Sequence, residues 1–148
     1  MKPITATNRS LSALYTVSIP KFVLLYLMTG GGFLFYWSYR NWAFYKKADG
    51  VSITPVMRGL FWPFFTLELF EKIQSGLDKA RQPLCWHPES RALLIMLLVM
   101  LSVLLLTFFD RPLDRLFICA ANSVLFICIG GLFVGAQRAI NVLQSNNA

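Results

Sequence analysis

Residues 92–109 read ALLIMLLVMLSVLLLTFF, and this stretch decides the fold. It contains no charged side chain, and its only polar side chains are Ser102 and Thr107. A helix of this length rises about 27 Å, which is close to the hydrocarbon thickness of a bilayer. A helix of a soluble protein shows one polar face, and this stretch shows none. The stretch therefore predicts a membrane-spanning helix.

Two further stretches are apolar enough to span, and they give an all-α, polytopic membrane protein as the predicted fold class. The first covers about residues 22–39, FVLLYLMTGGGFLFYWSY, with Lys21 and Arg40 placed to reach opposite headgroup layers. The second covers about residues 116–136. The sequence thus predicts a single membrane domain over residues 1–148, with three full spans.

Glycine occurs inside both of these stretches. Gly30, Gly31 and Gly32 interrupt the first at mid-depth, and each weakens a helix by up to about 1 kcal/mol relative to alanine. Close approach of another helix is the preferred explanation, and a broken helix is the alternative. Gly131 and Gly135 form a GxxxG pair, whose spacing permits two helix backbones to pack closely. All five glycines are therefore candidate helix-packing residues.

The link between the two last spans is six residues of polar and turn-forming character, residues 110–115. A link this short cannot recross a bilayer, so residues 92–109 and 116–136 are expected to form an antiparallel hairpin. Asn122 is expected at shallow depth in the second of these helices.

Aromatic and basic side chains alternate in residues 36–47, YWSYRNWAFYKK, directly after the first apolar stretch. Rings and cations together at headgroup level are typical of an anchor at the lipid interface. The same pattern can resemble a platform for single-stranded nucleic acid, but its place beside a span favours lipid and no nucleic-acid partner is expected. The predicted anchor residues are Trp37, Arg40, Trp42, Tyr45, Lys46 and Lys47.

Residues 55–73, PVMRGLFWPFFTLELFEKI, are apolar only in part. The charge-free core is short, Pro63 interrupts it, and Arg58 and Glu68 flank it. Such a length is more typical of an interfacial or re-entrant helix than of a full span, although a four-span bundle is the alternative. Arg58 and Glu68 are candidate intramembrane charges, and the simpler reading pairs Glu68 with Lys72 one turn later at the membrane surface.

The distribution of the 14 Lys and Arg residues favours one topology. Four spans would place eight of them on the side of the carboxyl terminus and six on the other. Three spans, with residues 55–73 not crossing, would give nine and five. Because cytoplasmic loops carry the excess of positive charge, we expect three spans and a cytoplasmic carboxyl terminus.

Three short motifs carry a resemblance to a known group of proteins. They are YWSYRNW at residues 36–42, ITP with Arg58 at residues 53–58, and QRAIN at residues 137–141. The pattern resembles that of small bacterial inner-membrane proteins with no assigned activity, in which an aromatic pair often stands where this chain has Val56 and Met57. The resemblance implies a multi-pass protein of the bacterial cytoplasmic membrane, and it implies no mechanism.

Catalytic and metal-binding chemistry is not expected. The chain has one histidine, His87, and three cysteines, too few for a second Cys/His pair beside Cys85 and His87. Cys119 and Cys128 fall in an apolar stretch and are interpreted as small packing residues. The sequence therefore predicts no enzyme, no metal site and no cofactor, and the net charge of +7 is attributed to contact with anionic lipids.

Three functions are compatible with this pattern. The preferred one is an accessory or regulatory membrane protein that acts by helix packing with itself or with a larger membrane complex. The alternative is a minimal oligomeric transporter or channel, in which Glu68 and Arg58 line the path. A weaker alternative is an immunity-type protein that blocks a membrane-targeted toxin.

Overall fold

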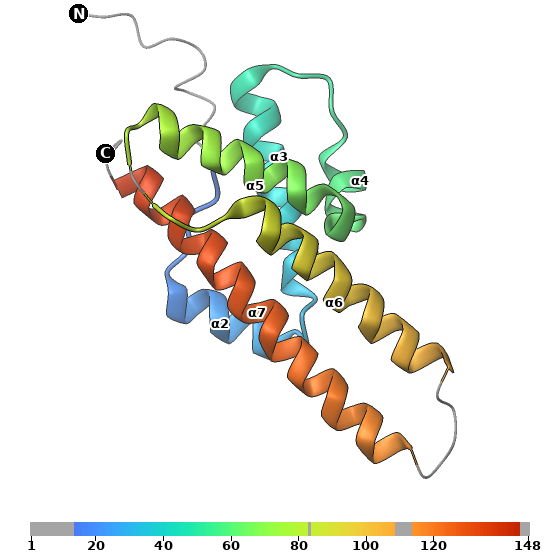
Figure 1. Ribbon diagram of the computed structural model, residues 1–148. Coiled ribbons are helices and arrows are strands. Elements are labelled where there is room, and N and C mark those ends of the chain that lie inside the picture. The colour runs from blue at the N-terminus through green and yellow to red at the C-terminus, as the bar shows by residue number, and fades with distance from the viewer. Residues whose placement is uncertain (1–13, 83, 109–113, 146–148) are drawn as a thin grey trace, which may run out of the picture.

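The computed structural model describes residues 14–82, 84–108 and 114–145, and every regular element in this part of the chain is a helix (Figure 1). The all-α prediction is thus confirmed. In chain order the helices are α2 (Ile19–Met28), α3 (Phe33–Asp49), α4 (Pro55–Leu60), α5 (Trp62–Lys79), α6 (Pro88–Phe108) and α7 (Arg115–Ser145).

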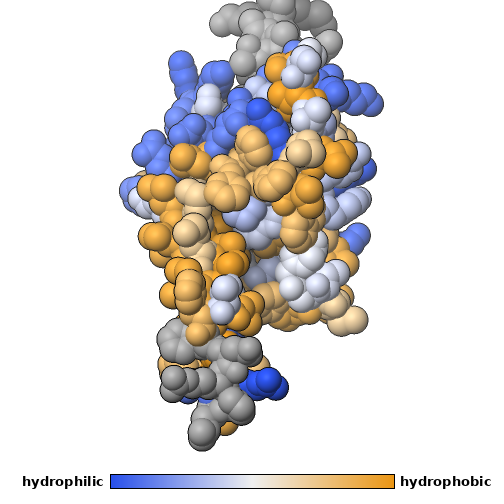
Figure 2. Space-filling model, turned by 90° about the vertical axis from the view of Figure 1, so that its right-hand side faces the viewer, coloured by the Kyte–Doolittle hydropathy of each residue, from blue (hydrophilic) through white to orange (hydrophobic). Residues whose placement is uncertain are grey.

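Helices α6 and α7 are long and apolar enough to cross a membrane. Only 11% of the most apolar window of α6 and 28% of that of α7 is buried, whereas the core helix of a soluble protein would be mostly buried. Nine large apolar side chains of α6 are exposed. Figure 2 shows one face of the molecule, on which hydrophilic residues gather at the upper end and hydrophobic residues cover most of the surface below them.

The two long helices run side by side, and they project together beyond the other helices (Figure 1). Helix α6 includes residues 92–108 of the predicted span, and α7 extends the predicted span 116–136 to Ser145. Most of the predicted link lies outside the described residues, since only Asp114 and Arg115 of residues 110–115 are placed. A hydrogen bond between Ser102 Oγ and Asn122 Oδ1, 2.5 Å long, joins the two helices.

The first predicted span is not one helix. It breaks at residues 29–32 into α2 and α3, so the explanation by helix packing alone is wrong and the broken-helix alternative holds. Gly30 and Gly31 have φ angles of +58° and +87°, a region that glycine enters without steric cost. Gly31 N donates to Tyr26 O at 2.9 Å, and Gly30 N donates to Leu27 O at 3.2 Å. These two bonds define a Schellman motif, which ends α2 at this point.

The break leaves few polar groups of the backbone unpaired. Thr29 Oγ1 donates to Leu25 O at 2.7 Å and accepts from Phe33 N at 2.8 Å, so it connects the end of α2 to the start of α3. Every backbone N–H of residues 29–35 has a hydrogen-bond acceptor. Such pairing is required for a helix break in an apolar environment, because an unpaired buried N–H is costly.

Helix α3 folds back along α2 and along the extended segment that precedes it. The Phe22 ring lies 5.4 Å from the Phe33 ring and 6.2 Å from the Trp37 ring, measured between centroids. Tyr15 N donates to Asn41 Oδ1 at 3.1 Å. The chain before α2 and the end of α3 therefore lie at the same end of the molecule, and the Gly30–Gly31 turn is the tip of a hairpin.

Helices α4 and α5 form a second hairpin, whose tip is Phe61. Helix α4 runs back along α3, and the contact is so close that a Cβ on Gly59 would lie 2.9 Å from Tyr39 Cβ. Helix α5 then returns, beginning with Trp62, whose ring centroid lies 5.3 Å from that of Phe133 on α7. Residues 55–73 are therefore not a single helix, and α5 continues to Lys79.

Helix α7 is the central element of the fold. Its buried residues follow one face over most of its 31 residues. Helices α2, α5 and α6 contact it along its length. Because only α6 and α7 of the described helices are both long and apolar enough to span, the three-span prediction is not confirmed. Two shorter hairpins accompany these two helices.

Candidate functional site

The extended segment before α2 is held between α3 and α7 by four side-chain amides. These belong to Asn41, Gln137, Asn141 and Gln144. Gln137 Nε2 donates to Tyr15 O at 3.3 Å, Asn141 Nδ2 donates to Val17 O at 3.0 Å, and Gln144 Nε2 donates to Leu14 O. All four bonds go to backbone groups of the segment, so its position does not depend on the identity of its side chains. The side chains of Leu14 and Val17 are buried in the core.

Gln137 also joins α7 to α3. Trp37 Nε1 donates to Gln137 Oε1 at 2.6 Å, and Gln137 Nε2 donates to Asn141 Oδ1 at 2.8 Å. Trp37 and Gln137 are both fully buried. This bond brings the YWSYRNW and QRAIN motifs together, although 100 residues separate them in sequence. Sequence reasoning assigned no role to Asn41, Gln137 or Asn141.

A signal for these polar residues was present in the sequence. Trp37 and Asn41 are four residues apart, and so are Gln137 and Asn141, so each pair lies on one face of its helix. Amide side chains at the end of an apolar helix, spaced in this way, indicate a polar contact with a neighbouring element.

The predicted interface anchor is contradicted at its two tryptophans. Trp37 and Trp42 are 1% and 0% exposed, so they belong to the core and the prediction that they anchor at a lipid interface is wrong. Trp37 packs edge-on against Phe133 at 5.4 Å between centroids. Lys46 and Lys47 are exposed at the end of α3, and lipid anchoring by these two residues stays a prediction.

The two candidate intramembrane charges form an ion pair. Arg58 Nη1 lies 2.7 Å from Glu68 Oε2, across the α4–α5 hairpin, and Lys72 Nζ lies farther away, 4.0 Å from Glu68 Oε1. The expected pair of Glu68 with Lys72 is therefore present, but Arg58 is the closer partner of Glu68. Lys72 also donates to the Tyr45 hydroxyl at 3.1 Å.

Arg58 is further fixed by two aromatic rings. Its guanidinium carbon lies 4.2 Å from the Trp42 ring centroid and 5.0 Å from that of Phe65. Cation–π contact at these distances stabilises a partly buried guanidinium. The Arg58–Glu68 ion pair therefore joins α4 to α5 in the second hairpin, and the Glu68 carboxylate neutralises the charge of Arg58.

Most of the glycines predicted to allow close helix packing do not do so, whereas Gly130, which was not among them, does. A Cβ on Gly130 would lie 2.5 Å from Tyr26 Cε1, so this glycine admits the Tyr26 ring between α2 and α7. At Gly131, and also at Gly30, no atom lies within 4 Å of that position. Gly131 thus makes no helix contact within the described chain, and Gly135 is covered by the Arg91 guanidinium rather than by a helix backbone.

Both hairpin tips border one pocket of about 440 Å³. Thr29 and Gly30 line it from the first hairpin, Leu60 and Pro63 from the second, and Val99 from α6. Beside it, Tyr26 stacks on Phe126 at 4.4 Å between centroids and its hydroxyl donates to Phe126 O at 2.7 Å. The lining is mainly apolar.

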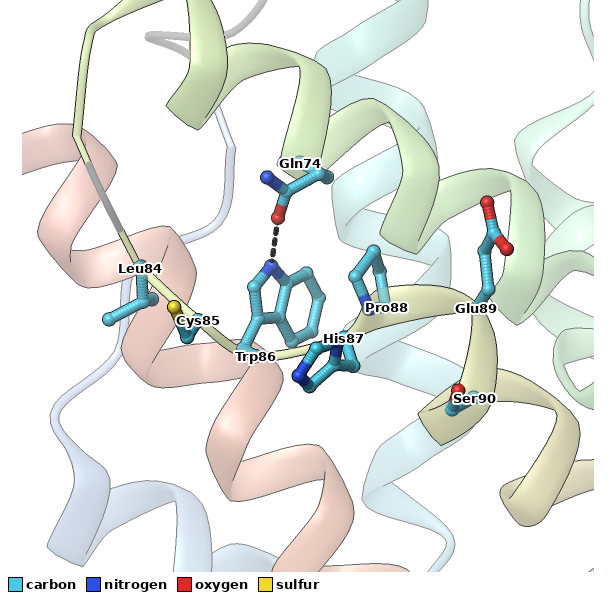
Figure 3. A pocket seen from close by; sticks show the side chains of 8 residues that line it. All are labelled: Gln74, Leu84, Cys85, Trp86, His87, Pro88, Glu89 and Ser90. Carbon is cyan, nitrogen blue, oxygen red and sulfur yellow. Dashed lines mark hydrogen bonds between the residues drawn. The ribbon is translucent and has the colours of Figure 1, made fainter.

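A second pocket, of about 420 Å³, lies where the chain enters α6 (Figure 3). In Figure 3 the indole of Trp86 points toward α5, where its Nε1 donates to Gln74 Oε1 at 2.6 Å. His87 is exposed and has a φ of +46°.

Among the described residues no three His, Cys, Asp or Glu side chains group as metal ligands would. Cys119 and Cys128 are exposed, so their interpretation as packing residues is wrong within the chain.

Comparison with family models, with curated proteins and with solved structures finds no match for this chain. The resemblance to small bacterial inner-membrane proteins therefore stays a prediction, which rests on the three motifs.

Proposed function

We propose that this chain is an integral membrane protein that crosses the bilayer twice, through α6 and α7, while its two hairpins enter from one side and turn back inside. Arg115 and Arg138 stand 23 positions apart on α7, and the segment between them contains no charged residue. At 1.5 Å per residue they are about 35 Å apart, enough to bracket the hydrocarbon core. Phe126, which contacts Tyr26 beside the first hairpin tip, lies near the middle of this interval. The first tip would therefore lie close to the bilayer midplane.

Charge supports this two-span arrangement better than the three-span one. Of the 14 Lys and Arg, three (Lys2, Arg9 and Arg111) fall outside the described residues, which leaves eleven. In the proposed orientation ten of these eleven lie on the side where α7 ends, and Arg115 lies on the other. By the positive-inside rule the ten are cytoplasmic. The bacterial cytoplasmic membrane as the location is proposed on the motif resemblance alone.

We further propose that the protein is an accessory or regulatory subunit that acts by packing against other membrane helices. The observation that carries this proposal is that α6 and α7 alone form the end of the molecule that projects beyond the other helices (Figure 1). Two helices cannot enclose a path for a solute. Their large exposed apolar side chains instead offer contact area to lipid or to another membrane protein.

A pair of adjacent glycines on α7 tests this proposal. Gly131 has open space beyond it, and Gly130 faces the Tyr26 ring. Gly131→Leu should therefore leave the monomer folded and reduce assembly, measured as the mass of the complex extracted in mild detergent. Gly130→Leu is the matched comparison, and it should disturb the fold itself. A wild-type protein that extracts only as a monomer would contradict the accessory function.

A transporter or channel is the second candidate, and one observation favours it. Two helix breaks meet at a single pocket at the proposed mid-depth, an arrangement typical of substrate and ion sites in transporters. Several copies would be needed to complete a path. Ion flux into proteoliposomes of the pure protein, abolished by Glu68→Gln, would establish this function in place of the accessory one. The immunity-type function stays a prediction.

A further inference from the structure

Arg40 is a cation that is surrounded by aromatic rings. Its guanidinium carbon lies 4.8 Å from the ring centroid of Phe44, 5.4 Å from that of Tyr15 and 5.8 Å from that of Tyr36. Its Nε is buried and has no hydrogen-bond partner among the residues that the structure describes. Both ion pairs found among the described residues involve Glu68, so no carboxylate there compensates Arg40.

Arg58 provides the comparison within the same molecule. It too lies over aromatic rings, Trp42 and Phe65, but it also has the Glu68 carboxylate at 2.7 Å. Rings hold a guanidinium in place and orient its donors, but they do not neutralise it. The planar fork of an arginine matches a carboxylate or a phosphate. The Arg40 arrangement is thus complete except for an anion.

The surroundings of Arg40 limit the source of that anion. On the same helix, Phe35, Tyr36 and Tyr39 are exposed on the side of the hairpin tip, and Lys46 and Lys47 are exposed beyond Arg40. If α7 crosses the bilayer as proposed above, Arg40 lies at headgroup level, because Trp37 one turn below it binds Gln137 beside Arg138. The anion present in quantity at that level is the phosphate group of a lipid.

We propose that Arg40, with the rings of Tyr15 and Tyr36, forms a binding site for the phosphate group of an anionic phospholipid. One wall of the site depends on the amide network. Asn41 accepts the backbone N–H of Tyr15, and Gln137 donates to the Tyr15 carbonyl, so these bonds hold the Tyr15 ring over the guanidinium. The extended segment before α2 therefore positions a residue of a lipid site. This inference rests on the proposed membrane orientation.

Native mass spectrometry of the detergent-solubilised full chain tests the site, with anionic phosphatidylglycerol as the probe and phosphatidylcholine as the comparison, because choline balances the charge of its phosphate and leaves no net charge. Arg40→Gln should weaken phosphatidylglycerol binding by at least about tenfold, because a charge-assisted contact is lost. Lys79→Gln is the matched control: it removes the same charge at an exposed residue of α5 that is not among the predicted lipid anchors, and it should leave binding nearly unchanged. Arg40→Lys, which keeps the charge and so should fold even if Arg40→Gln does not, should bind severalfold more weakly because it lacks the fork.

Four results would overturn the site: equal losses for Arg40→Gln and Lys79→Gln, wild-type binding by Arg40→Lys, equal binding of the two lipids, or displacement of the lipid by inorganic phosphate. The last result would assign the site to a free phosphate ion. A failure of the membrane orientation is recognised separately, because it would appear in cysteine labelling and would not depend on Arg40.

Discussion

The hydrogen bond between Trp37 and Gln137 should contribute measurably to stability. Both side chains are buried and the Nε1–Oε1 distance is 2.6 Å. Gln137→Leu keeps the approximate volume but leaves the indole N–H without an acceptor, which costs about 1–3 kcal/mol. Trp37→Phe leaves the Gln137 carbonyl oxygen without its donor and adds the loss of ring volume. In the double variant neither partner of this bond is orphaned, and the loss of the Gln137 Nε2 contacts with Tyr15 and Asn141 is common to both variants that carry Gln137→Leu and cancels in the cycle. The double variant should therefore be less destabilised than the sum of the single variants by about 1–3 kcal/mol.

Unfolding in detergent micelles, followed by far-ultraviolet circular dichroism, gives the four free energies of this cycle. Trp42 supplies the control, since it is equally buried and its Nε1 has no hydrogen-bond partner. Trp42→Phe combined with Gln137→Leu should be additive within about 0.3–0.5 kcal/mol. If the free-energy changes in the Trp37–Gln137 cycle are additive, or if both cycles show the same coupling energy, the role assigned to the Trp37–Gln137 hydrogen bond is refuted.

Three further changes have defined outcomes. Gly30→Ala should lower the free energy of unfolding by about 1 kcal/mol, because the Gly30 φ of +58° disfavours a residue with a side chain. Gly131→Ala should raise the free energy of unfolding, because Gly131 is helical and has open space beside it. Gly130→Leu should separate α2 from α7 and lower the midpoint of thermal unfolding, and it should do so much less in a Tyr26→Ala background, which lacks the ring that the larger side chain would displace. Glu68→Gln should lower the midpoint of thermal unfolding through a loss of about 1 kcal/mol, a small effect because the side chain is 42% exposed; an unchanged midpoint would show that the contact with Arg58 contributes nothing.

The long helices could be predicted from sequence because their signal is local. Eighteen residues without a charge leave few alternatives to a span, and the structure has a helix over residues 92–108. The break at Gly30–Gly31 was harder to predict. A run of three glycines is compatible both with close packing, which is the preferred reading from sequence, and with a broken helix, and the positive φ angles that distinguish them depend on the hairpin as a whole.

The site residues could be predicted only where their pairing is local. Trp37 and Trp42 have the composition of an interface anchor, but the burial of Trp37 is decided by Phe133 and Gln137 on α7, about 100 residues later. Glu68 was paired with Lys72 because four residues separate them, whereas the hairpin brings Arg58 closer. Contacts between helices distant in sequence leave no periodic signal in a single chain.

The number of membrane crossings is tested most directly by labelling single cysteines with a membrane-impermeant maleimide, in a variant whose three native cysteines are replaced by alanine. Thr16→Cys, Asp49→Cys and Lys79→Cys should all react from the cytoplasmic side, and Arg115→Cys should react from the opposite side. The first three positions flank the two hairpins, so their agreement means that neither hairpin crosses the bilayer. Labelling of Thr16→Cys and Asp49→Cys from opposite sides would contradict the two-span account and restore a first span over residues 22–39.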